Sequence, residues 1–139
     1  MFDRVLCTLT SNLPTREQRL EVFRNAAAAI RPDGKFVFSA HYYGLRALVK
    51  RSPRSGYYEK HQIFRYLSGK RELADEALVQ FRRVSCRPIT VRVPFERQLH
   101  LADISIARVL ERVPIINWMS DLLLVTADHP KPPKDFPAS

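Results

Sequence analysis

The chain has 139 residues, 45% of them hydrophobic, and a formal net charge of +9. This length and apolar content fit one domain that buries a core without disulfide or metal support. No apolar run approaches the roughly 20 residues that span a bilayer, and we expect no secretory leader at the start. Cys7 and Cys86 lie in strand-like stretches outside any CxxC motif, which favours buried thiols in a reducing cytoplasm over a disulfide or metal site.

The first thirty residues predict a strand followed by a helix. Residues 2–9 predict a buried strand, because Val5, Leu6, Cys7 and Leu9 form a nearly continuous apolar run, typical of a strand whose two faces are both covered by helices. Thr15 and, three positions later, Gln18 form a capping box at the start of the helix. Apolar residues at helical spacing continue that helix to Ile30.

A turn and a second strand follow. The Pro32-Asp33-Gly34 sequence is predicted to end the helix, with Gly34 giving access to positive φ. Residues 35–39 then predict a buried strand. Strand, helix and strand in this order make a βαβ unit, so we expect the two strands to be parallel.

Shorter elements are predicted beyond Gly44. In chain order they are a short helix near 45–49, a short strand over 63–67, a helix that Ser68 caps and that runs through Phe81, a long strand over 84–93, a helix over 101–110 and a final strand over 121–127. Pro88 inside the long strand favours an edge position or a bulge. We expect a domain over 1–128 and a disordered, proline-rich tail over 129–139.

Positive charge gathers in a connecting segment over residues 46–71, which holds eight lysine and arginine residues against Glu59 alone. Tyrosine and phenylalanine side chains are interleaved with them. One interpretation is a solvated segment that docks on the rest of a larger protein. The other is a patch that holds an anionic substrate, or that binds nucleic acid, with the candidate contacts Arg46, Lys50, Arg51 and Arg54.

An ordered set of segments resembles class I methyltransferases that depend on S-adenosylmethionine (SAM). The sequence Phe2-Asp3-Arg4-Val5-Leu6-Cys7 is similar to their fourth strand, and Ile30-Arg31-Pro32-Asp33-Gly34-Lys35-Phe36-Val37-Phe38-Ser39 to the turn and fifth strand. Val91-Arg92-Val93-Pro94-Phe95 and Leu122-Leu123-Leu124-Val125 are similar to the last two strands. The resemblance covers nearly the whole chain except 44–58 and the tail.

This resemblance implies an α/β fold: the C-terminal half of a Rossmann-like methyltransferase sheet, a mixed sheet with an antiparallel final hairpin. The glycine-rich turn that grips a nucleotide cofactor is absent, because none of the four glycines forms GxGxG. The family's strand order would place a further strand beside residues 2–9, so that edge is expected to be apolar and unpaired. We favour a fragment of a full enzyme over a natural half that pairs with a partner chain, or a remnant without catalysis.

The resemblance also assigns candidate site residues at the carboxyl ends of the first two strands, where ligands bind in such sheets. Cys7, Thr8 and Leu9 would line the methionine end of SAM, and Asn12 would face the substrate. The alternative is that Cys7 and Leu9 are core residues and that Asn12 is a turn residue.

The second strand ends at His41, Tyr42 and Tyr43. His41 and Tyr42 are the candidate catalytic residues, with His41 acting as a base or orienting an acceptor hydroxyl or amine. Tyr42 and Tyr43 would form a wall of the pocket or stack on an aromatic acceptor, and Tyr43 is the candidate contact to the methyl acceptor. The alternative is a surface histidine without a catalytic role. The expected function is methyl transfer from SAM to an unidentified acceptor by the full enzyme, this chain alone being inactive. The rival is a non-catalytic binding or assembly module that pairs through its first-strand edge or binds nucleic acid.

Overall fold

A computed structural model describes residues 1–8, 10–57, 62–91 and 119–132. Its elements are β1 (Phe2–Cys7), the 3₁₀ helix η1 (Thr10–Asn12), α1 (Arg16–Ala29), β2 (Ile30–His41), α2 (Leu45–Val49), β3 (Ser55–Tyr57), β4 (Phe64–Tyr66), α3 (Lys70–Leu78), β5 (Phe81–Val91) and β6 (Ser120–Pro130). The helix predicted over 101–110 lies outside the described residues, as does most of the predicted tail.

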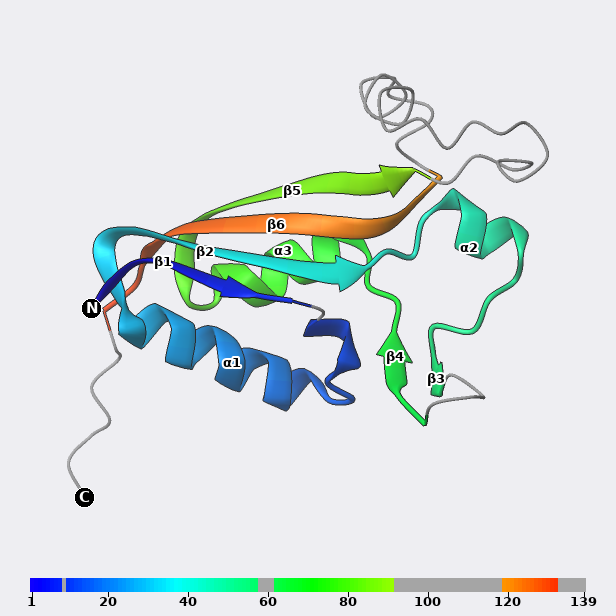
Figure 1. Cartoon of the computed structure of the whole chain (residues 1–139), viewed down its shortest axis with the longest axis horizontal. Coiled ribbons are helices and arrows are strands. Elements are labelled where there is room, and N and C mark those ends of the chain that lie inside the picture. Colours follow the sequence, from blue (N-terminus) through cyan, green and yellow to red (C-terminus); the bar gives the residue numbers. More distant parts are fainter. Residues whose placement is uncertain (9, 58–61, 92–118, 133–139) are drawn as a thin grey trace.

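The main sheet has four described strands in the order β1-β2-β6-β5 (Figure 1). β1 and β2 are parallel, whereas β6 is antiparallel to both β2 and β5. The predicted mixed α/β sheet with an antiparallel final hairpin is therefore confirmed. β3 and β4 form a separate two-stranded hairpin.

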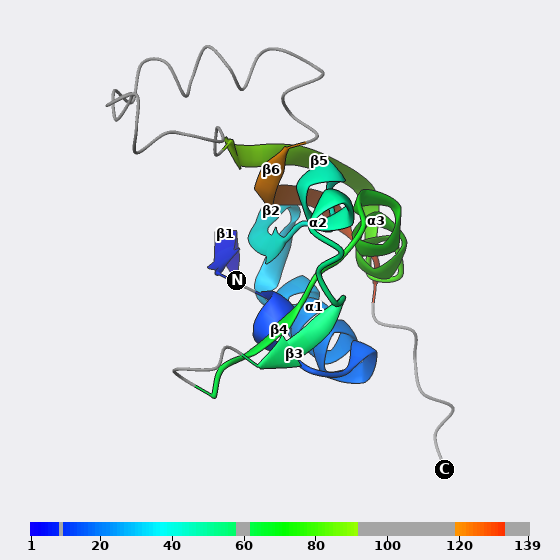
Figure 2. The ribbon, with the colours of Figure 1, turned by 90° about the vertical axis from the view of Figure 1, so that its right-hand side faces the viewer.

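The core lies between the sheet and two helices. Figures 1 and 2 show α1 and α3 on the same face of the sheet. Phe23 of α1 packs against Phe36 and Phe38 of β2, with ring centroids 5.9 and 4.8 Å away, and all three side chains are fully buried. These aromatic contacts attach α1 to β2.

The opposite face corrects the expectation for the first strand. Val5 and Cys7 pack against the core, but Leu6 is 73% exposed and Phe2 63% exposed. Among the described residues, α1 and α3 cover one face of β1 and leave Leu6 and Phe2 exposed on the other, so the predicted helical cover on both faces is not found there. β1 is also the edge of the described sheet and pairs with β2 alone.

The capping box at α1 is confirmed. The backbone N–H of Gln18 donates to Thr15 Oγ1 at 3.2 Å, and the backbone N–H of Thr15 donates to Gln18 Oε1 at 3.3 Å. Two backbone donors at the helix start thus find partners locally, which is why the sequence alone could place this boundary.

The predicted turn at residues 32–34 is wrong. β2 already begins at Ile30, and the β1–β2 register shifts between Phe2 and Arg4 to accommodate the extra residues. No described glycine has positive φ. Gly34 is required instead for close approach, because a Cβ there would lie 2.5 Å from Ile30 Cγ2 and 2.8 Å from the Asp3 carbonyl oxygen.

Three further boundaries differ from the predictions. α3 begins after Gly69, not Ser68, and ends at Leu78, while Phe81 begins β5. β6 runs to Pro130 and therefore includes the first two residues of the predicted tail.

Pro88 does lie in an edge strand, as predicted, because β5 closes the other side of the described sheet. No helix in the described ranges is long and apolar enough to cross a membrane.

Candidate functional site

The loops that follow β1 and β2 are tied together at the carboxyl end of the two parallel strands. Thr10 Oγ1 donates to the Ser39 carbonyl oxygen at 3.2 Å, and the His41 amide donates to Ser11 Oγ at 3.1 Å. Thr10 and Ser11 are 1% and 0% exposed, so both bonds are shielded from water. The two strand ends that sequence analysis selected are thus joined by buried hydrogen bonds.

The segment after β2 is anchored on both sides by its backbone. The Tyr42 amide donates to the Asp121 carbonyl oxygen at 2.9 Å, from the start of β6. The Ser68 amide donates to the His41 carbonyl oxygen at 3.0 Å, and the Tyr43 amide donates to the Ser68 carbonyl oxygen at 2.9 Å. These bonds hold His41 and Tyr42 in place before any ligand binds.

A cavity of about 320 Å³ lies at this end of β2. α2, the β4 segment and the start of β6 form its other walls. Arg46 on α2 makes an ion pair with Asp121 at 2.8 Å. The lining residues are His41, Tyr42, Arg46, Ala47, Lys50, Ser52, Arg65, Leu67 and Asp121.

Burial and charge act together on His41. Burial lowers the pKa of its imidazole, the nearby Arg65 lowers it further, and Asp121 opposes this shift. His41 is therefore held in its neutral form at pH 7, the form that can accept a proton. Burial also raises the pKa of the Tyr42 hydroxyl, so this group stays protonated and can donate a hydrogen bond.

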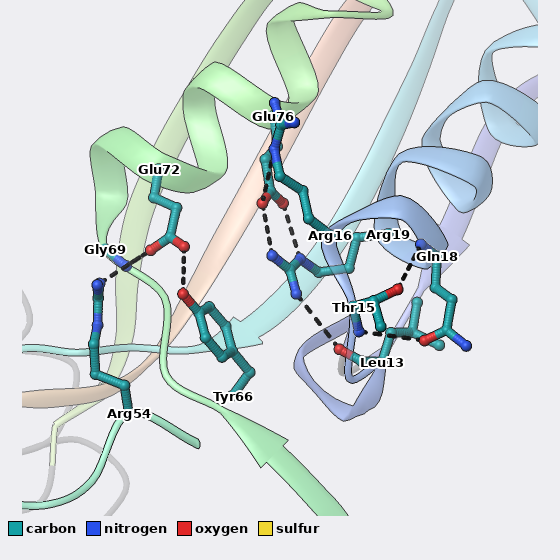
Figure 3. Close-up of polar contacts among 10 residues, drawn as sticks. All are labelled: Leu13, Thr15, Arg16, Gln18, Arg19, Arg54, Tyr66, Gly69, Glu72 and Glu76. Carbon is teal, nitrogen blue, oxygen red and sulfur yellow. Dashed lines mark hydrogen bonds and ion pairs between the residues drawn. The ribbon is translucent and has the colours of Figure 1, made fainter. Parts of the chain in front are cut away.

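Tyr43 belongs to a second cluster, next to the cavity. Its ring lies under the guanidinium of Arg54, 5.0 Å from ring centroid to Cζ. Arg54 also pairs with Glu72 at 3.0 Å, and the Tyr66 hydroxyl donates to Glu72 at 2.6 Å (Figure 3). This network ties the β3–β4 hairpin to α3.

A buried ion pair joins the two helices. Arg19 of α1 donates to both carboxylate oxygens of Glu76 on α3, at 2.9 and 2.6 Å (Figure 3). Both side chains are almost completely buried. Its full hydrogen bonding and burial mark this pair as part of the scaffold.

Comparison with known proteins supports the fold. The sequence matches neither a protein-family profile nor a curated protein. A crystal structure of an S-adenosylmethionine dependent methyltransferase from Mesorhizobium loti is similar over 91% of this chain, with a TM-score of 0.51 and 17% sequence identity. The chain has a methyltransferase-like fold. It spans 61% of the length of that methyltransferase.

The candidate cofactor residues of this methyltransferase-like fold lie at the end of β1. Cys7 is half-buried and Thr8 is exposed, while Leu9 falls outside the described residues. Asn12, a candidate substrate contact, is half-buried in η1. The Thr8 hydroxyl and the strand-end backbone suit the polar methionine end of SAM. Asp3 lies at the opposite end of β1, away from this site, so among the described candidate residues the fit would be to the methionine end of SAM.

The four basic residues proposed for nucleic acid have different surroundings. Arg46 and Arg54 are held in ion pairs with Asp121 and Glu72, whereas Lys50 and Arg51 are exposed.

Sequence analysis missed Arg65 and Asp121 as cavity residues. Arg65 was counted only within the basic segment, and Asp121 only as the start of a strand. The local signal for Asp121 is its position near the start of β6, and Arg65 has no local signal beyond its place in the basic segment.

Proposed function

We propose that this chain forms the acceptor side of a SAM-dependent methyltransferase, with the methyl acceptor bound in the cavity at the end of β2. One observation carries the proposal: in a methyltransferase-like sheet, the cavity lies at the carboxyl end of a parallel strand, beside a neutral histidine. Ligands of open α/β sheets bind at this end of the strands.

Methyl transfer asks for alignment and for removal of a proton from the acceptor. SAM, when bound, supplies a methyl group on a sulfonium that departs as a neutral thioether. His41 accepts the proton of the acceptor as the acceptor's lone pair bonds the methyl carbon. Tyr42 forms a wall of the cavity and donates a hydrogen bond through its hydroxyl. Thr8 and Cys7, one strand away, would hold the methionine end.

Calorimetric titration of SAM into the purified chain tests the cofactor part of the proposal. We expect weak binding, because the described residues suit one end of SAM only. Thr8→Lys should abolish it by filling the end of β1. Ser85→Lys is the matched control, since it places the same side chain at an exposed position of β5 and should leave binding unchanged. Absence of binding heat at millimolar SAM would contradict SAM binding by this chain. Equal loss of SAM binding in Thr8→Lys and Ser85→Lys would contradict a site at the end of β1.

A second candidate function, strand-mediated assembly, is favoured by the β1 edge. Within the described sheet β1 pairs on one side only and exposes Leu6 and Phe2, and an unpaired, apolar edge is a template for another strand. In the purified protein the available partner is a second copy. Sedimentation should then show concentration-dependent dimers that Leu6→Lys dissociates. Val49→Lys is the control, because Val49 is 75% exposed but lies on α2. A monomer at all concentrations would contradict this pairing.

A further inference from the structure

We propose that the acceptor is a small organic anion, a carboxylate or phosphate monoester, whose charged group is held by Lys50 and whose apolar part lies against Tyr42 and Leu67. The inference rests on the proposed function and names the class of its substrate. It is carried by the charge balance, the shape and the size of the cavity at the end of β2.

Among the described residues that line this cavity, cations outnumber carboxylates. Arg46 on α2, Lys50 just after it and Arg65 on β4 line one space, and Asp121 is the carboxylate among these described lining residues. Asp121 is already engaged by Arg46 at 2.8 Å. Among the described residues Lys50 has no ion-pair partner. Cations gathered around one cavity repel one another, and an anionic group bound among them relieves that repulsion with charge-assisted hydrogen bonds.

The remaining lining suits an organic rather than an inorganic anion. Tyr42, Ala47 and Leu67 present apolar surface, and Leu67 is 5% exposed. Small-molecule sites combine such apolar walls with a few convergent polar groups. One end of the ligand would therefore be charged, and the other aromatic or aliphatic.

Size separates this ligand from a nucleic acid. A volume of about 320 Å³ lies at the lower end of the range for small-molecule pockets, roughly 300–1,000 Å³. Single-stranded nucleic acid needs a longer positive groove with stacking platforms. Tyr43 and Tyr66, the neighbouring aromatic rings, are already covered by Arg54, with centroid distances of 5.0 and 6.0 Å.

His41 is placed to act on such a ligand. It lines the same cavity, and the charged groups around it among the described residues are Arg65 from β4, Asp121 from β6, Arg46 from α2 and Lys50 just after α2. An anionic acceptor anchored by Lys50 would present its hydroxyl or amine to this histidine.

Binding is tested on the purified chain without SAM, by calorimetry at low salt with benzoate, phenyl phosphate and the neutral benzamide. We expect benzoate or phenyl phosphate to bind and benzamide not to bind, the stronger of the two anions showing which charged group the cavity prefers. Lys50→Gln should weaken anion binding about three- to fivefold, as expected for one partly exposed ion pair. Arg51→Gln is the matched control, because Arg51 is exposed, adjacent and outside the cavity lining, and should have no effect.

Several results would overturn the inference. They are equal binding of benzamide, equal weakening by Lys50→Gln and Arg51→Gln, or binding of a single-stranded RNA oligonucleotide without binding of either anion. Because SAM is omitted, the outcome is separate from the fate of the proposed function. Anion binding that depends on Lys50 stands even if SAM fails to bind, and SAM binding without anion binding would remove only the acceptor class.

Discussion

The helix-covered face of the sheet and the carboxyl end of β2 both contain ion pairs, but their charges are balanced differently. Between α1 and α3, Arg19 and Glu76 are each 3% exposed as residues, and the carboxylate accepts two bonds from one guanidinium. At the strand end, Arg46 and Asp121 have side chains 29% and 35% exposed, and further cations line the same cavity.

This difference separates scaffold from site. A buried ion pair whose partners satisfy each other has no remaining capacity for a ligand, and losing one partner leaves an uncompensated charge. A half-exposed pair beside additional cations costs little to rearrange and retains capacity to bind an anion. Substitutions at the Arg19–Glu76 pair should therefore change mainly the free energy of unfolding. Substitutions at the cavity at the end of β2 should change mainly ligand affinity.

The largest effect is expected at Glu76. Glu76→Ala leaves Arg19 buried and unpaired, and should lower the free energy of unfolding by about 3–5 kcal/mol, measured by urea denaturation. Glu21→Ala, which breaks the exposed Arg24 pair, should change it by less than about 0.5 kcal/mol. The double variant Arg19→Met/Glu76→Leu should regain most of the loss. A double variant as unstable as Glu76→Ala would show that the loss does not come from the unpaired charge of Arg19.

The β1–β2 contact gives the next largest effect, and it tests the scaffold without altering charge. Gly34→Ala places a methyl group 2.8 Å from the Asp3 carbonyl oxygen, and should lower the free energy of unfolding by about 1–3 kcal/mol. Gly56→Ala is the matched control, because nothing lies within 4 Å of the added carbon. Equal stability of the two variants would mean that β1 is held too loosely for this contact to matter.

A smaller effect on stability is expected at Asp121, where substitution should strengthen the binding of an anion. Asp121→Asn removes the carboxylate from the cavity and should increase benzoate affinity about two- to threefold, while costing at most about 1 kcal/mol of stability. Calorimetry and urea denaturation measure the two quantities. Asp75→Asn, at an exposed position of α3, is the control for general charge. Weaker benzoate binding in Asp121→Asn would contradict an anion site.

The features that sequence analysis predicted are those with local causes. The Thr15–Gln18 capping box needs only four consecutive residues. The rule that sites lie at strand ends selects His41 and Tyr42, whose roles stay predictions. Features set by distant contacts could not be predicted. Gly34 matters because of the backbone at Asp3, and Arg19 meets Glu76 across 57 positions.

Exposure of β1 was likewise not predictable, because apolar periodicity shows which residues can be buried and not which layers are present to bury them. Leu6 fits a covered strand by sequence, yet it lies on the face opposite α1 and α3. The cavity residues Arg65 and Asp121 come together only when β4 and β6 take their places around the end of β2.

The smallest effect is the pH dependence that His41 contributes, and it tests whether the strand end is built around a neutral imidazole. Because the folded pKa lies below the ordinary value of about 6.5, the unfolded chain binds the proton more readily. The associated stability is present above pH 6.5 and is lost as the pH falls from there through the folded pKa. His41→Gln should flatten this part of the stability curve, measured by urea denaturation between pH 7.5 and 5, whereas His129→Gln, at an exposed position of β6, is the matched control.

A bound benzoate ion adds negative charge beside the imidazole and should raise its pKa, so the NMR titration of His41 should move upward with benzoate and stay in place with benzamide. An unchanged titration in saturating benzoate would mean that the anion binds away from His41. His41 could then not act as the base for an acceptor bound at that site.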